Sequence, residues 1–185
     1  KLIIDPNNNN VFYATTQGAT EYTDKVGDGA GVFKSNDRGN SWTQINNGLD
    51  SLETNILTVD PNDSETLYLG TDDDGVYKST DGGESWKKLT VSSLSKSFGV
   101  GDIIVDPQNS NNIYIGTVDY FRLSESRGVL GDFGVYKSTD GGATWEEFNV
   151  GLNHLGVFSL ELSEENRILY AGTRAGGVYW ISLDN

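Results

Sequence analysis

The sequence predicts an all-β protein, a β-propeller of four-stranded antiparallel blades, and three observations predict this fold. An eight-residue phrase with the pattern S-x-D-x-G-x-[S/T]-W occurs three times. Around it, short runs rich in Val, Ile, Tyr and Trp alternate with Gly, Asn, Asp and Pro, as in strands joined by turns. Four such strands in repeats of about 45 residues match a propeller blade.

The first predicted strand of each repeat is apolar and ends at an Asp-Pro pair, which is degenerate in the fourth copy. Its copies are 3–6, 58–61, 104–107 and 160–163. Because Asp before Pro at a strand end begins a turn, we expect Asp5, Asp60 and Asp106 to have a structural role.

The second and third predicted strands also recur four times. The second strand ends in a small residue and Thr, at 11–15, 67–71, 113–117 and 169–173. The third begins with Gly-Val-aromatic, at 31–33, 75–77, 134–136 and 177–179. A fourth, short polar strand follows the Trp of each phrase, so the last repeat lacks it.

The phrase itself predicts a tight hairpin between the third and fourth strands. Asp and Ser oxygens accept backbone N–H bonds there, Gly provides a positive φ, and we expect the Trp to pack into its own blade. The phrase residues with this expected structural role are Ser35, Asp37, Gly39, Trp42, Ser79, Asp81, Gly83, Trp86, Ser138, Asp140, Gly142 and Trp145.

The repeats predict one partial propeller over 1–185, with about 3.75 blades at approximately 1–50, 51–95, 96–152 and 153–185. The unpaired edge of the last blade favours membership of a larger propeller, completed by missing residues, a second polypeptide or a symmetry copy. A closed four-bladed ring is the alternative.

Two connections between the second and third strands are long, at about 16–30 and 118–133. If the other turns share one end of the propeller, these loops emerge at the opposite end, where propellers generally bind ligands. Loops of this length are usually functional or disordered. We expect ligand binding by Tyr22, Tyr120, Phe121 and Arg122, although the loops could instead cover each other or a neighbouring chain.

The phrase and its surrounding pattern, Tyr-x-Gly-Thr followed by Gly-Val-Tyr-Lys-Ser-Thr-Asp-Gly-Gly-x-[S/T]-Trp, resemble the Asp-box, or bacterial neuraminidase repeat, propellers. The family includes sialidases, xyloglucan-degrading glycoside hydrolases, sortilin-type receptors and photosystem II assembly factors. The resemblance is greatest to the xyloglucanases and assembly factors. It implies a propeller whose Asp-box turns lie opposite the usual binding surface.

Composition limits the partners and the location of the protein. The formal net charge is −14 without a basic stripe, which argues against nucleic acid and anionic membranes, and no apolar run is long enough to span a bilayer. Abundant Asn, Ser, Thr and Gly, with neither Cys nor Met, favours an extracellular or cell-surface protein, with the periplasm as an alternative.

A glycosidase would need two carboxylates about 5 to 9.5 Å apart. The long loops offer Glu21, Asp24, Asp119 and Glu125 as weak catalytic candidates. No metal site or cofactor is predicted. The three consecutive Asp residues at 72–74 suggest a calcium site, but an acidic tight turn explains the run better.

The leading interpretation is a non-catalytic extracellular propeller that binds a glycan or protein, or serves as a structural assembly module. Two alternatives stay open. One is a xyloglucanase-like glycoside hydrolase fragment that acts through paired carboxylates, and the other is an assembly or chaperone factor.

Overall fold

The computed structural model describes residues 1–18, 29–94, 98–118 and 133–183. These residues form fifteen strands and no helix. The strands are β1 Leu2–Asp5, β2 Asn8–Thr16, β3 Gly31–Ser35, β4 Thr43–Gln44, β5 Thr54–Asp60, β6 Asp63–Thr71, β7 Val76–Ser79, β8 Lys87–Lys88, β9 Gly99–Val105, β10 Ile113–Val118, β11 Val135–Ser138, β12 Glu146–Glu147, β13 Val157–Ser163, β14 Ile168–Thr173 and β15 Gly177–Ser182.

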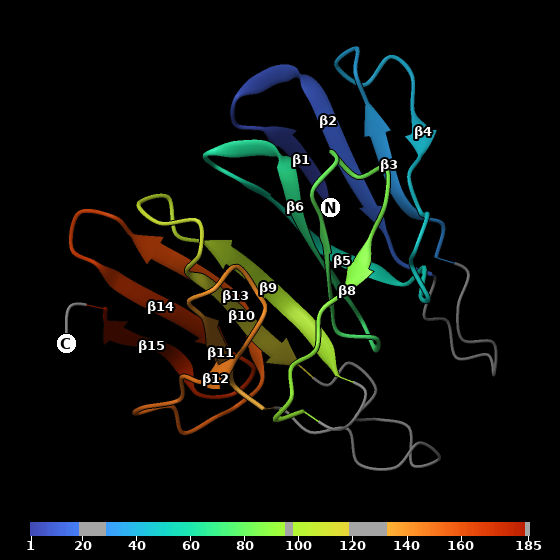
Figure 1. The fold of residues 1–185 in the computed structure, drawn as a ribbon. Coiled ribbons are helices and arrows are strands. Elements are labelled where there is room, and N and C mark those ends of the chain that lie inside the picture. Colours follow the sequence, from blue (N-terminus) through green and yellow to red (C-terminus); the bar gives the residue numbers. More distant parts are fainter. Residues whose placement is uncertain (19–28, 95–97, 119–132, 184–185) are drawn as a thin grey trace, which may run out of the picture.

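The strands form four separate antiparallel sheets, each made from one sequence repeat. Blade 1 is β1–β4, blade 2 is β5–β8, blade 3 is β9–β12, and the three-stranded blade 4 is β13–β15. The sheets follow one another in chain order along an open arc, with blades 1 and 4 at its two ends (Figure 1). The predicted partial propeller is confirmed, and the alternative of a closed four-bladed ring is wrong.

The hydrophobic core lies between neighbouring blades rather than inside any one of them. Alternate residues of a strand point to opposite faces, so each blade has one face toward the preceding blade and one toward the following blade. In blade 2, Leu67 and Leu69 join a cluster with Tyr13 and Val32 of blade 1. Tyr68 joins a cluster with blade 3 instead.

The outermost strand is short in every blade that has one. The strands β4, β8 and β12 contain two exposed residues each, because the chain leaves the sheet soon after the hairpin. Among the described residues, β15 has a strand partner on one side only, namely β14. The sequence had predicted this missing fourth strand from the absence of a fourth phrase.

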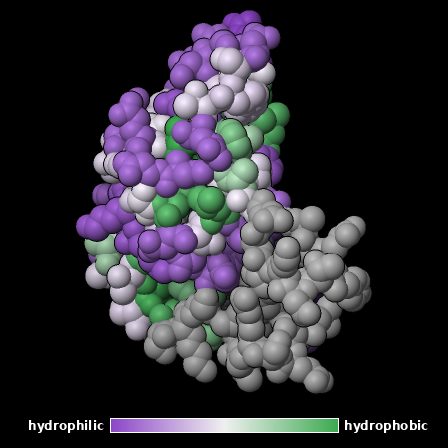
Figure 2. Space-filling model, turned by 90° about the vertical axis from the view of Figure 1, so that its right-hand side faces the viewer, coloured by the Kyte–Doolittle hydropathy of each residue, from purple (hydrophilic) through white to green (hydrophobic). Residues whose placement is uncertain are grey.

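The surface is mainly hydrophilic, as the net charge of −14 suggests. Figure 2 views the molecule from the side on which blade 1 lies in Figure 1 and shows hydrophobic atoms in separate areas between hydrophilic ones. Within the part of the chain that the structure describes, no helix has the length and apolar character needed to cross a membrane.

Candidate functional site

The connections between strands divide into two ends of the propeller. At the Asp-box end, the phrase hairpins lie against the turns between the first two strands of their own blades. The hydrogen bonds that join them run from Arg38 N to Asn10 O, from Gly82 N to Glu65 O and from Gly141 N to Asn111 O. The other connections, with the described ends of both long loops at 16–18, 29–30, 118 and 133, lie at the opposite end, which we call the loop end.

The Asp-box carboxylates are saturated with hydrogen bonds. Ser79 Oγ donates to Asp81 Oδ1 over 2.7 Å and accepts from Gly83 N over 2.9 Å. Ser85 donates to Asp81 through its backbone N and its hydroxyl. These bonds, first those of Ser85, lower the pKa of Asp81 to about 2. The two other boxes repeat the geometry and the low pKa, so these groups hold hairpins together.

One prediction needs extending, because Trp86 and Trp145 pack at the interface with the preceding blade as well as against their own blade. Trp86 belongs to the cluster between blades 1 and 2, and its Nε1 donates to Ile45 O of blade 1. Trp145 likewise lies in the cluster between blades 2 and 3. Trp42 has no such neighbour among the described residues, and its side chain is 39% exposed, against 5% for Trp86.

The Asp-Pro turns form a second repeated contact at this end. Each Asp accepts its own turn's backbone N–H, as the turn prediction requires, and also binds a donor from the next blade. The donors are Ser64 Oγ to Asp5 (2.9 Å), Ser110 Oγ to Asp60 (2.7 Å) and the Arg167 guanidinium, bidentate, to Asp106 (3.0 and 2.6 Å). The Asp-box end therefore fastens blade to blade.

The residues predicted to bind ligand or to act as catalytic acids lie in the two long loops. All of them fall outside the described residues: Glu21, Tyr22, Asp24, Asp119, Tyr120, Phe121, Arg122 and Glu125. What the structure does describe is the base of each loop and the acidic residues beside it.

Glu53 holds the first long loop at both of its described ends. Its Oε2 accepts from Gly18 N over 2.7 Å, and its Oε1 accepts from Gly29 N over 2.9 Å. Glu53 lies in the connection between blades 1 and 2, directly before β5, so this connection supports the base of a blade 1 loop. Sequence reasoning missed this residue, because nothing in the local sequence distinguishes it from an exposed Glu.

Asp72 is a buried acid beside this loop base. Gln17 Nε2 donates to both of its carboxylate oxygens, over 3.0 and 3.1 Å. Burial, with smaller contributions from the nearby charges of Glu53 and Asp73, raises the pKa of Asp72 to about 6, although the hydrogen bond from Gln17 acts in the opposite direction. Asp72 therefore titrates just below neutral pH.

The neighbouring Asp74 is already paired. It accepts a hydrogen bond from the hydroxyl of Tyr77 and forms an ion pair with Lys88. Among the described residues, no group of three or more His, Cys, Asp or Glu side chains is arranged to hold a metal ion. The acidic run 72–74 is thus a turn whose side chains bind Gln17, Tyr77 and Lys88.

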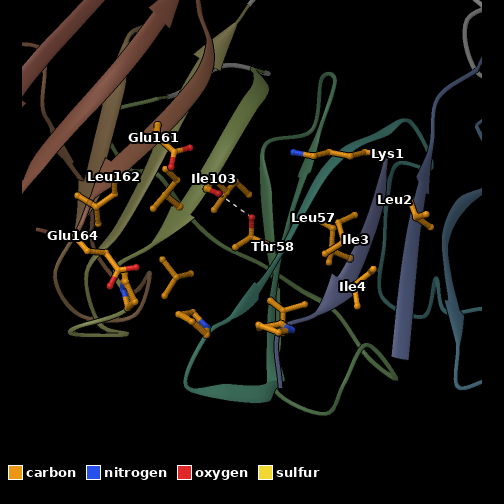
Figure 3. Close-up of a pocket in the computed structure, with 16 residues that line it drawn as sticks. Lys1, Leu2, Ile3, Ile4, Leu57, Thr58, Ile103, Glu161, Leu162 and Glu164 are labelled. Carbon is orange, nitrogen blue, oxygen red and sulfur yellow. Dashed lines mark hydrogen bonds between the residues drawn. The ribbon is translucent and has the colours of Figure 1, made fainter. Parts of the chain in front are cut away.

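A groove of about 480 Å³ runs along the inner side of the arc. Its walls come from the first strand of every blade, β1, β5, β9 and β13, and are largely apolar (Figure 3). The charged residues of its lining are Lys1 on one side and Glu161 and Glu164 on the other. Thr58 Oγ1 donates to Ile103 O over 2.8 Å between two of these strands. In propellers this position corresponds to the wall of the central channel.

Comparison with known proteins identifies the family. The model of the Sortilin-Vps10 family, described as "Sortilin, neurotensin receptor 3", matches residues 30–179. The chain belongs to the Sortilin-Vps10 family. This match begins just before the third strand of blade 1 and reaches into β15, so it covers all three Asp-boxes.

This Sortilin-Vps10 chain is also similar to xyloglucan-degrading enzymes. Over 96 residues, 47% of the chain, it is 36% identical to the xyloglucanase Xgh74A of Acetivibrio thermocellus, and the match covers 11% of that protein. The structure of an ancestral GH74 enzyme has a TM-score of 0.76 and 25% identity, and that of the GH74 enzyme of Niastella koreensis has 0.71 and 26%.

The alignments with these two structures cover 97% and 99% of the chain, but only 22% and 28% of the enzymes. The chain therefore spans about a quarter of their length. This chain and the two GH74 enzymes therefore share an Asp-box propeller architecture.

Proposed function

We propose that this chain is a non-catalytic segment of an Asp-box propeller that binds a glycan at its loop end. One observation carries the proposal: the described carboxylates at the base of the first loop serve to hold that loop. Glu53 caps two backbone N–H groups, and the oxygens of Asp72 accept from Gln17. A carboxylate pair that acts on a glycosidic bond needs groups free to reach the sugar.

A glycan is the first candidate ligand because relatives with 25% identity or more include a xyloglucanase and two GH74 enzymes. The binding residues we propose are the aromatic and charged side chains of the long loops, Tyr22, Tyr120, Phe121 and Arg122. Aromatic rings stack on the apolar faces of sugars, and the guanidinium donates to hydroxyls. The binding role requires no cofactor.

The decisive experiment measures binding and cleavage on the same protein. Titration calorimetry with xyloglucan oligosaccharides is expected to give saturable binding, and a reducing-end assay is expected to show no product. Tyr120→Ala and Arg122→Ala are expected to weaken binding. A matched control is Asn9→Ala, which changes an exposed residue at the Asp-box end and leaves binding unchanged. Absence of binding to any xyloglucan oligosaccharide would sink the glycan proposal.

A glycoside hydrolase is the second candidate, favoured by the pKa of Asp72. A carboxyl group with a pKa of about 6 is suited to donate a proton near neutral pH. Release of reducing ends that disappears in Asp72→Asn would establish this alternative. A protein ligand is the third candidate, since the family description names a receptor; its signature would be binding of a peptide and not of glycans.

We also propose an extracellular or cell-surface location, with the periplasm as the alternative. A polymeric glycan is too large to enter a cell, and a protein that binds it has to work outside. Fractionation of the native host, with detection of the chain in the medium, envelope and cytoplasm, tests this. Recovery in the cytoplasm alone would contradict it.

A further inference from the structure

Two acidic side chains, Glu53 and Asp72, hold the base of the first long loop together. Glu53 accepts from the backbone N–H groups of Gly18 and Gly29, and Asp72 accepts from Gln17, the residue before Gly18. The two acids are also joined to each other, because Asp72 N donates to Glu53 O over 3.0 Å. We call these five residues the clasp.

The propeller repeat does not require an acid at either position. In every blade a Thr hydroxyl near the end of the second strand bonds to the Gly before or at the start of the third strand. The residues that follow this Thr in the four blades are Gln17, Asp72, Val118 and Arg174. The position of Glu53 is held by Gly99 in blade 3 and by Gly156 in blade 4. Both acids therefore depart from the repeat at a single junction, and departures of this kind concentrate at functional places.

The burial of Asp72 is poorly compensated. Its side chain is 6% exposed, and in the described part of the chain its two oxygens share one donor atom, Gln17 Nε2, over 3.0 and 3.1 Å. By contrast, the buried Asp106 has the bidentate guanidinium of Arg167. A carboxylate removed from water with a neutral amide as its donor favours its protonated form.

The surrounding charges act in the same direction as burial. Glu53 and Asp73 are both negative and raise the pKa of Asp72. The other charged residue of this turn, Asp74, forms its own ion pair with Lys88. From β5, the clasp meets the uncharged Asn55, whose Oδ1 accepts from Gln17 Nε2 over 3.2 Å. Among the described residues, no cation is thus paired with Asp72.

The protonated form of Asp72 suits the clasp better than the ionised form. A neutral carboxyl group donates as well as accepts, and so does a side-chain amide. Once the Gln17 amide turns, protonated Asp72 can donate to Gln17 Oε1 while it still accepts from Nε2. The second hydrogen of Nε2 remains available for Asn55. Loss of the proton removes the first of these bonds and leaves a negative charge buried beside Glu53.

We propose that the clasp is a proton-operated switch, which is closed while Asp72 carries a proton and is driven toward an open form when Asp72 loses that proton to the solvent. In the open form, Gln17 leaves Asp72, and Gly18 and Gly29 leave Glu53. These contacts open together, because Gln17 and Gly18 are consecutive and the two acids are joined through their backbones. The inference concerns the base of the loop and does not depend on the proposed ligand.

The test measures amide hydrogen exchange of the full chain by NMR at pH 5, 6 and 7. Each rate is compared with the intrinsic rate at the same pH, which gives a protection factor that reports local opening. The protection factors of Gly18 and Gly29 are expected to fall about tenfold from pH 5 to pH 7. This factor follows if the pKa of Asp72 is about 6 in the closed clasp and has its ordinary value of 3.8 in the open one.

The second long loop provides a reference in the same sample. Phe133 N donates to Thr117 Oγ1 over 3.1 Å at the base of that loop, where Val118 takes the place of Asp72. The protection factor of Phe133 should therefore stay constant from pH 5 to pH 7. An equal fall at Phe133 would mean that the whole molecule opens, and it would overturn the switch.

Two variants assign the effect to one carboxyl group. Asp72→Asn cannot titrate, so the protection of Gly18 and Gly29 should become independent of pH. The matched variant Asp73→Asn removes a neighbouring charge and keeps Asp72, so the pH dependence should persist with a slightly lower midpoint. Circular dichroism checks that both variants are folded. A flat profile in the parent chain, or an unchanged profile in folded Asp72→Asn, would overturn the proposal.

Discussion

The two ends of the propeller differ in how strictly they repeat. At the Asp-box end, the same Ser, Asp and Gly atoms make the same bonds in three blades, and each Asp-Pro turn binds the next blade. At the loop end, a Thr hydroxyl bonds to the Gly that begins the third strand in every blade, but the connections differ in length and Glu53 and Asp72 have partners without equivalents in the other blades. Hydrogen bonds join neighbouring blades at both ends, but the Asp-box end repeats them more strictly, whereas the loop end varies in length and in its acidic residues.

The largest expected effect concerns the tryptophan between blades 1 and 2. Trp86→Ala removes a side chain buried between two blades together with its bond to Ile45, and we expect a loss of about 3 to 5 kcal/mol in the free energy of unfolding. Trp42→Ala, at the same Asp-box position but 39% exposed, should lose less than about 2 kcal/mol. Urea unfolding measures both. Equal losses would show that these residues do not act between blades.

The next effect tests the ion pair that joins blades 3 and 4. Arg167→Ala leaves the carboxylate of Asp106 buried without its bidentate partner, and we expect a loss of about 3 kcal/mol. Ser110→Ala removes the equivalent donor to Asp60 at the preceding interface and should cost only about 1 kcal/mol.

A double variant separates the ion pair from the loss of packing. Asp106→Asn combined with Arg167→Ala leaves no unpaired buried charge, so it should recover part of the stability lost in Arg167→Ala. No recovery in urea unfolding would mean that Arg167 stabilises the blade through its stem or backbone and not through Asp106.

The sequence predicted the repeated end far better than the loop end, for a physical reason. Local hydrogen bonds fix the Asp-box, so its eight residues are enough to predict it. Trp86 also packs on a neighbouring blade, a contact that local reasoning could not predict. Glu53 caps a loop that ends 24 residues before it in the chain, and no local signal marks such a contact.

A smaller effect distinguishes the two hydroxyls of one Asp-box. Ser79 Oγ is buried and bonds to Asp81 and Gly83, so Ser79→Ala leaves a buried N–H unsatisfied and should cost about 1 to 2 kcal/mol. Ser85 lies at the exposed rim, and Ser85→Ala should cost less than about 1 kcal/mol. The melting temperatures of Ser79→Ala and Ser85→Ala show which variant loses more stability. A larger loss in Ser85→Ala would mean that the exposed Ser85, and not the buried Ser79, stabilises the hairpin.

The smallest effect is a pH dependence of opposite sign at the two ends. Asp81 has a folded pKa of about 2, below its ordinary value of 3.8, so its contribution is present above about pH 4 and is lost as the pH falls toward 2. Asp72 has a folded pKa of about 6, above 3.8. At a pH between 3.8 and about 6, Asp72 binds more protons in the folded state than in the unfolded state. The free energy of unfolding therefore increases as the pH falls from about 6 to 4.

Asp72→Asn isolates the contribution of the loop end, because the amide is neutral throughout this range and can still accept from Gln17. The variant should gain stability at pH 7 relative to the parent chain and should show a weaker rise between pH 6 and 4. Asp102, whose pKa is also raised by burial, keeps its own part of that rise. The melting temperatures of the parent chain and of Asp72→Asn, measured from pH 7 to 2, should therefore differ above pH 4. Below pH 4 both should fall in parallel, because the three Asp-box carboxylates become protonated. Curves that stay parallel from pH 7 to 4 would show that Asp72 is not the group that titrates.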